Sequence, residues 1–93
     1  MDKVHAEIMA LKALTFMAQN EDILVAYLKQ TGIAPTDLHN SASDPAVLGS
    51  ILDYFLQNEK RLLAFCEVED MAPDLLVKAR LSFPGSEAVP DSI

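Results

Sequence analysis

The fold is decided by the stretch KVHAEIMALKALTFMA, residues 3–18, in which apolar or small side chains occupy most positions. At the helical repeat of about 100° per residue, these side chains cover two opposite sides. One side carries Val4, Ile8, Leu11, Thr15 and Ala18, and the other carries Ala6, Met9, Ala10, Ala13, Phe16 and Met17. A helix that is apolar almost all round is normally buried. We therefore expect this helix at the centre of the fold, with His5, Lys12 and Gln19 as a narrow polar strip.

A second helix of the same kind is predicted from Pro45 to about Gln57. Asp44 is a favourable cap, and proline is favourable at the first helical position. Polar residues form one narrow strip on this helix. Apolar residues cover the rest of its surface: Val47, Leu48, Ile51, Leu52, Tyr54, Phe55 and Leu56. Gly49 inside the helix costs about 1 kcal/mol relative to alanine. We interpret it as a point of close helix–helix approach.

Helix punctuation predicts shorter helices between and after these two. Asn20 is a favourable cap for a second helix, which should end where Gly32 can adopt a left-handed backbone. A third helix should start at Pro35, with Leu38 facing inward. Fifth and sixth helices are expected at about 58–69 and 73–83. The fold class is therefore all-α, a compact bundle of five to six helices in a single domain at 1–83, with 84–93 as a flexible C-terminal tail.

An internal repeat is visible when the chain is shifted by 38 residues. Gln19-Asn20-Glu21 then aligns with Gln57-Asn58-Glu59, and Ala34-Pro35 aligns with Ala72-Pro73. Leu24, Ala26 and Leu38 find identical partners as well: Leu62, Ala64 and Leu76. The bundle is thus predicted to consist of two pseudo-repeats, at about 10–42 and 48–80. Leu24 and Leu62 should occupy equivalent buried sites, as should Tyr27 and Phe65, with the Tyr27 hydroxyl reaching water or a carbonyl oxygen.

Charge and cysteine content narrow the function classes. The 93 residues carry a formal charge of −7, which disfavours binding to nucleic acid or to an anionic membrane surface. A membrane-spanning helix needs about 18 or more apolar residues in a row, and no such run is present. The single cysteine, Cys66, cannot form an internal disulfide, and the N-terminal residues lack a signal-peptide pattern. We expect a small acidic cytoplasmic protein with no nucleic-acid or membrane partner.

Residues with chemical potential are few, and none is assigned a catalytic, cofactor-binding or metal-binding role. Cys66 has no activating base near it in sequence and is interpreted as a buried, inert thiol. His39 with Asp37 and Asp44 is the best metal-like grouping, but such groups are common on surfaces. The carboxylates of Asp53 with Glu59, and of Glu67, Glu69 and Asp70, are interpreted as solvated. We therefore predict that the protein is not an enzyme and has no cofactor.

The stretch from residue 13 to residue 81 resembles a family of uncharacterised proteins, domain of unknown function 3572. The resemblance lies in ALTFMAQNED, YLKQTGIAPTDL, DPAVLGSILDYFLQNE and LLAFCE, which are helix punctuation rather than catalytic signatures. The chain departs from the family pattern at His39, because we expect a basic residue at this position. The resemblance implies a small all-helical cytoplasmic protein from alphaproteobacteria. It implies no activity, ligand or catalytic residue.

Two functions remain open from the sequence. The first is a protein-binding or adaptor module that acts through a homodimer or an unidentified protein partner. It is favoured by 51% hydrophobic residues in so short a chain and by two helices without a broad polar face. The alternative is a carrier or sensor of a small apolar ligand, with pocket walls built from Met9, Phe16, Met17, Tyr54 and Phe55.

Overall fold

The computed structural model describes residues 2–40 and 42–83, and within them the regular structure is entirely helical. The helices are α1 (Lys3–Gln19), α2 (Glu21–Thr31), α3 (Pro35–Asn40), α4 (Pro45–Leu56), α5 (Glu59–Glu69) and α6 (Asp74–Arg80). The Cα radius of gyration is 12.4 Å, close to the value of about 12 Å expected for a compact chain of this length. The predicted all-α bundle is confirmed. The predicted tail at 84–93 lies outside the described residues.

Helix caps explain most of the boundaries. The Asp44 and Asn58 side chains accept hydrogen bonds from the backbone N–H groups of Ala46 and Arg61, both at 2.9 Å. Asn20 behaves differently from the prediction, because its side chain makes no bond to the start of α2. Its Nδ2 instead donates to the carbonyl of Phe16 at 2.7 Å and so satisfies the end of α1. The two helices therefore share one residue as their junction.

Two left-handed residues end α2 and α5. Gly32 has a φ of 76° and its N–H donates to the carbonyl of Leu28 at 2.9 Å. Asp70, which aligns with Gly32 in the 38-residue comparison, has a φ of 54°. Glycine accepts this conformation without steric cost, and Asp tolerates it. The predicted stop at Gly32 is confirmed.

Small side chains hold α1 against the rest of the bundle. α1 makes its main contacts with α4 and α6, which also contact each other. The side of α1 that faces them carries three alanines with no exposed surface, Ala6, Ala10 and Ala13, followed by the buried Phe16 and Met17. The ring of Phe16 then contacts the rings of Phe55 and Phe65, with centroids 5.8 and 5.5 Å apart. The core is thus tight at one end of α1 and aromatic at the other.

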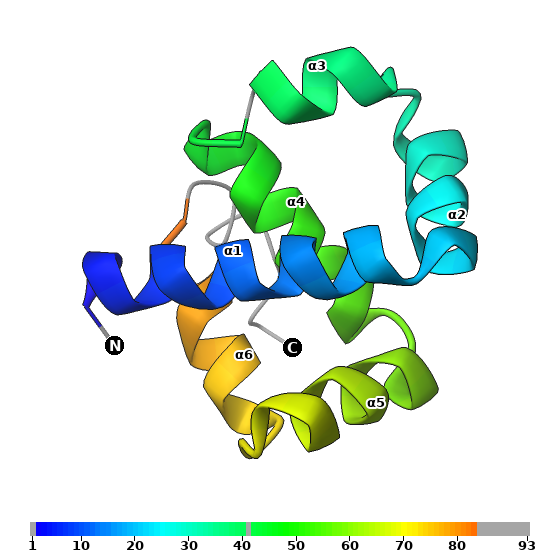
Figure 1. The fold of residues 1–93 in the computed structure, drawn as a ribbon. Coiled ribbons are helices and arrows are strands. Elements are labelled where there is room, and N and C mark those ends of the chain that lie inside the picture. The colour runs from blue at the N-terminus through cyan, green and yellow to red at the C-terminus, as the bar shows by residue number, and fades with distance from the viewer. Residues whose placement is uncertain (1, 41, 84–93) are drawn as a thin grey trace.

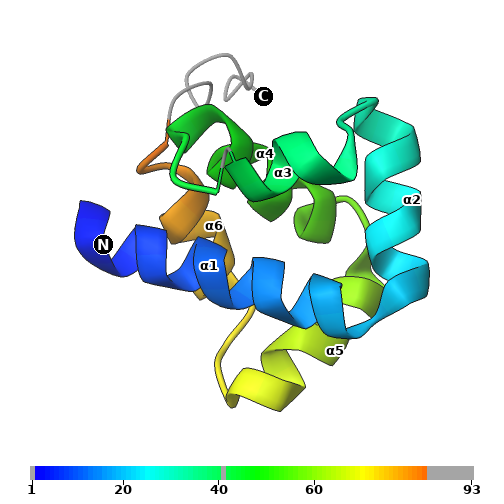
Figure 2. The ribbon, with the colours of Figure 1, turned by 45° about the horizontal axis from the view of Figure 1, so that its top comes forward.

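The expectation that α1 is buried nearly all round is wrong. Val4, Ile8 and Leu11 are 63%, 46% and 43% exposed. Figure 1 shows the reason, because α1 crosses the front of the molecule between the α2–α3 pair and the α5–α6 pair and is covered from behind. Figure 2 shows the same placement from a second direction. The helix has two apolar sides, and the bundle covers one of them.

The sixth helix is shorter than predicted, because the chain turns sharply after Arg80. Backbone bonds from Ser82 to Ala79 and from Phe83 to Arg80, both 3.1 Å, form this tight turn. The turn buries Phe83 against α4 at Gly49, where an added Cβ would lie 3.2 Å from the Cβ of Phe83. Gly49 is therefore the point of close approach that the sequence indicates.

The two aligned segments agree at several positions and differ at one element. Tyr27 and Phe65 have no exposed surface, and Leu24 and Leu62 are both half-buried rather than buried. The third helices differ, since α6 packs against both α1 and α4 whereas α3 makes no comparable contact among the described residues. Superposition of 10–42 and 48–80 as true repeats stays a prediction.

Gly32→Val should lower the free energy of unfolding by about 1–2 kcal/mol, because a β-branched side chain is disfavoured at a φ of 76°. Urea titration followed by circular dichroism measures this. Gly32→Asn is the matched control, since Asn tolerates the left-handed region, and it should cost less. Equal losses for Val and Asn would contradict this explanation of the helix end.

The Tyr27 hydroxyl lies 3.0 Å from the Ser50 hydroxyl and forms a hydrogen bond with it, a side-chain partner that the sequence does not predict. Tyr27→Phe and Ser50→Ala should each cost about 1 kcal/mol, because each leaves a poorly hydrated partner unpaired. The double variant should cost clearly less than the sum of the single variants. Additive losses in urea titrations would show that the two hydroxyls do not depend on each other.

Candidate functional site

Two of the polar groups with catalytic potential, Cys66 and Asp53, are engaged in the fold. Cys66 is buried, and desolvation raises the pKa of its thiol, so the reactive thiolate is disfavoured. The carboxylate of Asp53 accepts a hydrogen bond from the Nε–H of Arg80 at 2.7 Å. It is thereby bound to α6. Within 2–40 and 42–83, no group of three or more His, Cys, Asp or Glu side chains is arranged to hold a metal ion, so His39, Asp37 and Asp44 do not form one.

A polar network around Tyr54 is structural in character. The Tyr54 hydroxyl donates to the carbonyl of Ile23 at 3.2 Å, which connects α4 to α2. The guanidinium of Arg61 lies 3.6 Å from the centroid of the Tyr54 ring and donates through Nε, at 3.2 Å, and through Nη2 to the Tyr54 carbonyl. Burial raises the pKa of Tyr27, and its hydrogen bond to Ser50 opposes that shift. These contacts use side-chain donors to join helices.

The pocket walls proposed for an apolar ligand are part of the core. Phe16, Met17, Tyr54 and Phe55 are all buried, and their side chains pack in a single apolar cluster. Met9 is partly buried and lines a surface pocket with Ile8 and Leu75. A carrier or sensor of a small apolar ligand stays a prediction. The sequence pattern cannot separate these cases, because core side chains and cavity walls have the same composition and spacing.

The outward side of α1 carries three of the exposed large hydrophobic side chains, Val4, Ile8 and Leu11. We call it the α1 stripe: Val4, Ile8, Leu11, Thr15 and Ala18, all exposed. Its members follow one another at intervals of four, three, four and three residues, which keeps them on one line along a helix. An isolated exposed apolar side chain is ordinary, whereas a continuous line of them marks an interaction surface.

Grooves border the α1 stripe on both sides. The α1–α5 groove, of about 260 Å³, is lined by Ile8, Leu11 and Thr15 on one side and by Val68 and Glu69 on the other. The α1–α3 groove, of about 370 Å³, lies on the opposite side of α1 and includes Leu14, Ala18, Leu24, Leu38 and His39. The α1 stripe is therefore a ridge between two shallow apolar grooves, and Val68 (66% exposed) extends the apolar surface onto α5.

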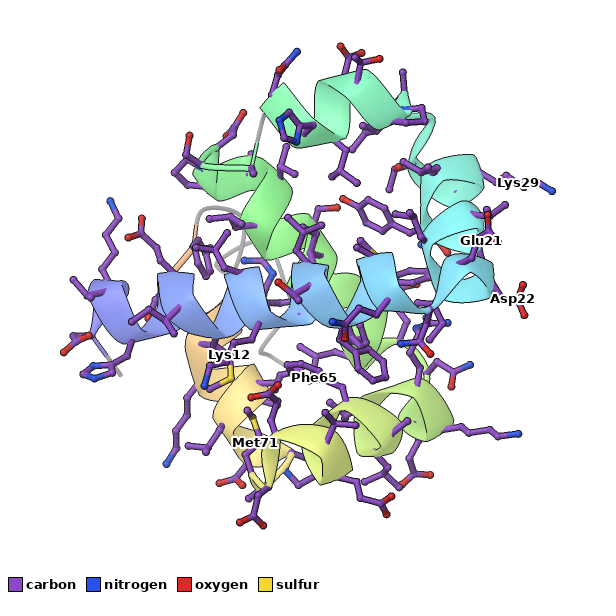
Figure 3. All side chains as sticks on the ribbon, viewed as in Figure 1. Lys12, Glu21, Asp22, Lys29, Phe65 and Met71 are labelled. Carbon is purple, nitrogen blue, oxygen red and sulfur yellow. The ribbon has the colours of Figure 1, made fainter. Side chains whose placement is uncertain are left out.

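Charges within residues 2–19 are balanced, unlike those of the whole chain. Residues 2–19 contain two lysines, Lys3 and Lys12, and two acidic residues, Asp2 and Glu7. Lys12 points from α1 toward α5 (Figure 3), where its Nζ lies 3.5 Å from a carboxylate oxygen of Glu69. Glu21 and Asp22 extend from the outer side of α2, away from this helix (Figure 3). The net charge of −7 thus arises outside α1.

The fold and its surface describe a small all-helical protein in which one apolar side of a helix is exposed between two grooves. Residues 3–86 match the family described as protein of unknown function DUF3572, and the chain belongs to that family. No curated protein and no solved structure matches the chain. The resemblance found in the sequence is confirmed, and the alphaproteobacterial source stays a prediction. In the described part of the chain, no helix combines the length and hydropathy needed to cross a membrane.

The sequence pattern located the α1 stripe and left open whether it lies in the core or at an interface. Its spacing was readable from residues 4–18, because both sides of the helix are apolar. Which side faces outward depends on α4 and α6, which come later in the chain. In the first half of α1 the two sides differ in side-chain size, since the inward positions 6, 10 and 13 are alanines and the outward positions 4, 8 and 11 are larger. The difference reverses at the end of the helix, where Phe16 and Met17 face inward.

The buried Cys66 thiol should react roughly a hundredfold more slowly with a thiol reagent such as Ellman's reagent in the folded protein than in urea. Its burial and raised pKa both suppress the thiolate. The rate should rise with urea in parallel with unfolding. Fast labelling of the folded chain would show that the thiol is accessible and would contradict its interpretation as buried and inert.

Proposed function

We propose that the protein is a non-catalytic protein-binding module whose contact surface is the α1 stripe. The observation that carries the proposal is the exposure of Val4, Ile8 and Leu11 along one line of a helix whose opposite side is fully packed. Removing these apolar side chains from water by binding a partner is favourable by about 25 cal/mol per Å² of apolar surface buried.

The charges beside the α1 stripe support binding to a protein. A surface with balanced charge imposes little long-range repulsion on a partner, and an apolar centre with a charged rim is the usual anatomy of such interfaces. Lys12, Glu69 and Glu7 provide this rim. The acidic remainder of the chain keeps the protein from associating through its other faces.

The proposal includes the absence of catalysis and a cytoplasmic location. The first is supported by the environments of Cys66, which is buried, and of Asp53, which is held by Arg80. The second is supported by a lone free thiol, which is typical of reducing compartments.

A small apolar ligand is the second candidate, and the α1–α3 groove favours it. The groove volume of about 370 Å³ lies at the lower end of the range of known ligand pockets, about 300–1,000 Å³. Native mass spectrometry of the protein purified from its source cells distinguishes the two. A reproducible adduct of a few hundred daltons, lost in Leu38→Gln, would favour the ligand.

Site-specific photocrosslinking tests the protein-binding proposal. A benzophenone side chain replacing Ile8 in cells of the source organism should give a crosslinked product of discrete mass, because Ile8 lies in the α1 stripe. The same group at Lys60, an exposed position on α5, is the matched control and should give none. Leu11→Glu should suppress the product from position 8. Absence of any discrete product at position 8, or equal products at both positions, would contradict the proposal.

A further inference from the structure

The spacing of the α1 stripe is that of a coiled-coil seam. With Ile8 at position a of a heptad, Leu11 and Ala18 fall at d, Thr15 falls at a, and Val4 falls at the preceding d. The positions opposite the seam, Ala6 and Ala13, are completely buried in the protein's own core. α1 therefore packs into its own bundle on one side and presents a complete a/d line on the other.

We propose that the partner of the α1 stripe is a second copy of this chain, with the two α1 helices parallel about a two-fold axis. The inference rests on the proposed function of the α1 stripe as a binding surface. Within parallel coiled coils, a β-branched residue at a with leucine at d favours two strands over three or four, and Ile8 with Leu11 supplies this combination. Like positions then meet across the axis, so Ile8 lies against Ile8 and Leu11 against Leu11.

Charge complementarity supports this orientation. Glu7 falls at position g and Lys12 at the following e, and a parallel pair brings g of one helix beside the next e of the other. Two Glu7–Lys12 contacts therefore form across the axis. An antiparallel pair centred on Leu11 would bring the two Lys12 side chains together instead. Lys12 is 52% exposed beside Glu69, so it keeps free surface for the second carboxylate.

The rest of the chain agrees with a self-complementary contact through α1. Two copies that each carry −7 repel one another, and a contact through residues 2–19, whose lysines and acidic residues balance, adds little to this repulsion. A two-fold contact uses the same patch on both copies, and a ridge between two apolar grooves can fit an identical ridge beside it.

The area that a stable interface needs is larger than α1 alone can supply. A stable interface buries about 800 Å² per partner, and α1 is about 25 Å long at about 1.5 Å per residue. A flat contact of that length would have to be about 30 Å wide. Val68 and the two grooves must therefore contribute, and the whole side shown at the front of Figure 1 takes part.

Analytical ultracentrifugation of the full chain tests the proposal. The wild-type mass should approach twice 10.2 kDa as concentration rises. Leu11→Lys and Ile8→Lys should return it to the single-chain mass with an unchanged helical circular dichroism spectrum. Leu63→Lys is the matched control, because Leu63 is exposed to a similar degree, 47%, on α5 outside both grooves. It should leave the dimer intact. A monomer at every concentration, or equal loss of dimer with Leu63→Lys, would overturn the proposal.

Disulfide trapping tests the orientation in a Cys66→Ala background with oxidised glutathione as the oxidant. Val4→Cys and Ala18→Cys should each link to themselves, since a parallel seam places identical residues together at both ends. Linkage only in a mixture of the two variants would show an antiparallel pair and overturn the parallel arrangement. In the photocrosslinking experiment at position 8, a discrete product that is not twice the chain mass would contradict self-association and leave the protein-binding function standing.

Discussion

The structure depends on the close approach of the alanine side of α1 to α4 and α6. Ala6, Ala10 and Ala13 have no exposed surface, and their short side chains let neighbouring helices pack close to the α1 backbone. Ala79 on α6 and Gly49 on α4 are small and buried as well. In a chain of this size the apolar area available for burial is limited, so close packing of small side chains has a large share in holding the bundle together.

Close packing also explains why α3 and α6, which follow similar sequence segments, pack differently. The chain turns after α6 and places Phe83 against Gly49, while Arg80 bonds to Asp53 one turn further along α4. α6 is thereby fixed to the centre of the bundle. α3 has no such anchor among its described contacts apart from Leu38, and it borders the α1–α3 groove instead. The asymmetry between two segments of similar sequence thus follows from a few small and charged residues.

Sequence reasoning recovered the helices because their punctuation is local. Asp44, Asn58, Gly32 and Pro35 each act on the backbone within a few residues, and each boundary they indicate is present. The burial of Cys66 and the tight environment of Gly49 were also predictable. The exposure of Val4, Ile8 and Leu11 was not, because a helix with two apolar sides does not itself determine which side its neighbours cover. Asn20 failed as a cap for a similar reason, since a side chain between two helices can bond to either.

The central claim is that α1 has a tightly packed inner side and an open outer side. The same substitution on both sides tests it: Ala13→Leu inward and Ala18→Leu outward, each followed by urea unfolding at matched low concentration. Ala13 has no exposed surface, so added volume should cost about 1–3 kcal/mol of unfolding free energy. Ala18 is exposed, so Ala18→Leu should not destabilise by more than about 0.5 kcal/mol. Equal losses at the two positions, or a larger loss at Ala18, would contradict the two-sided arrangement of α1.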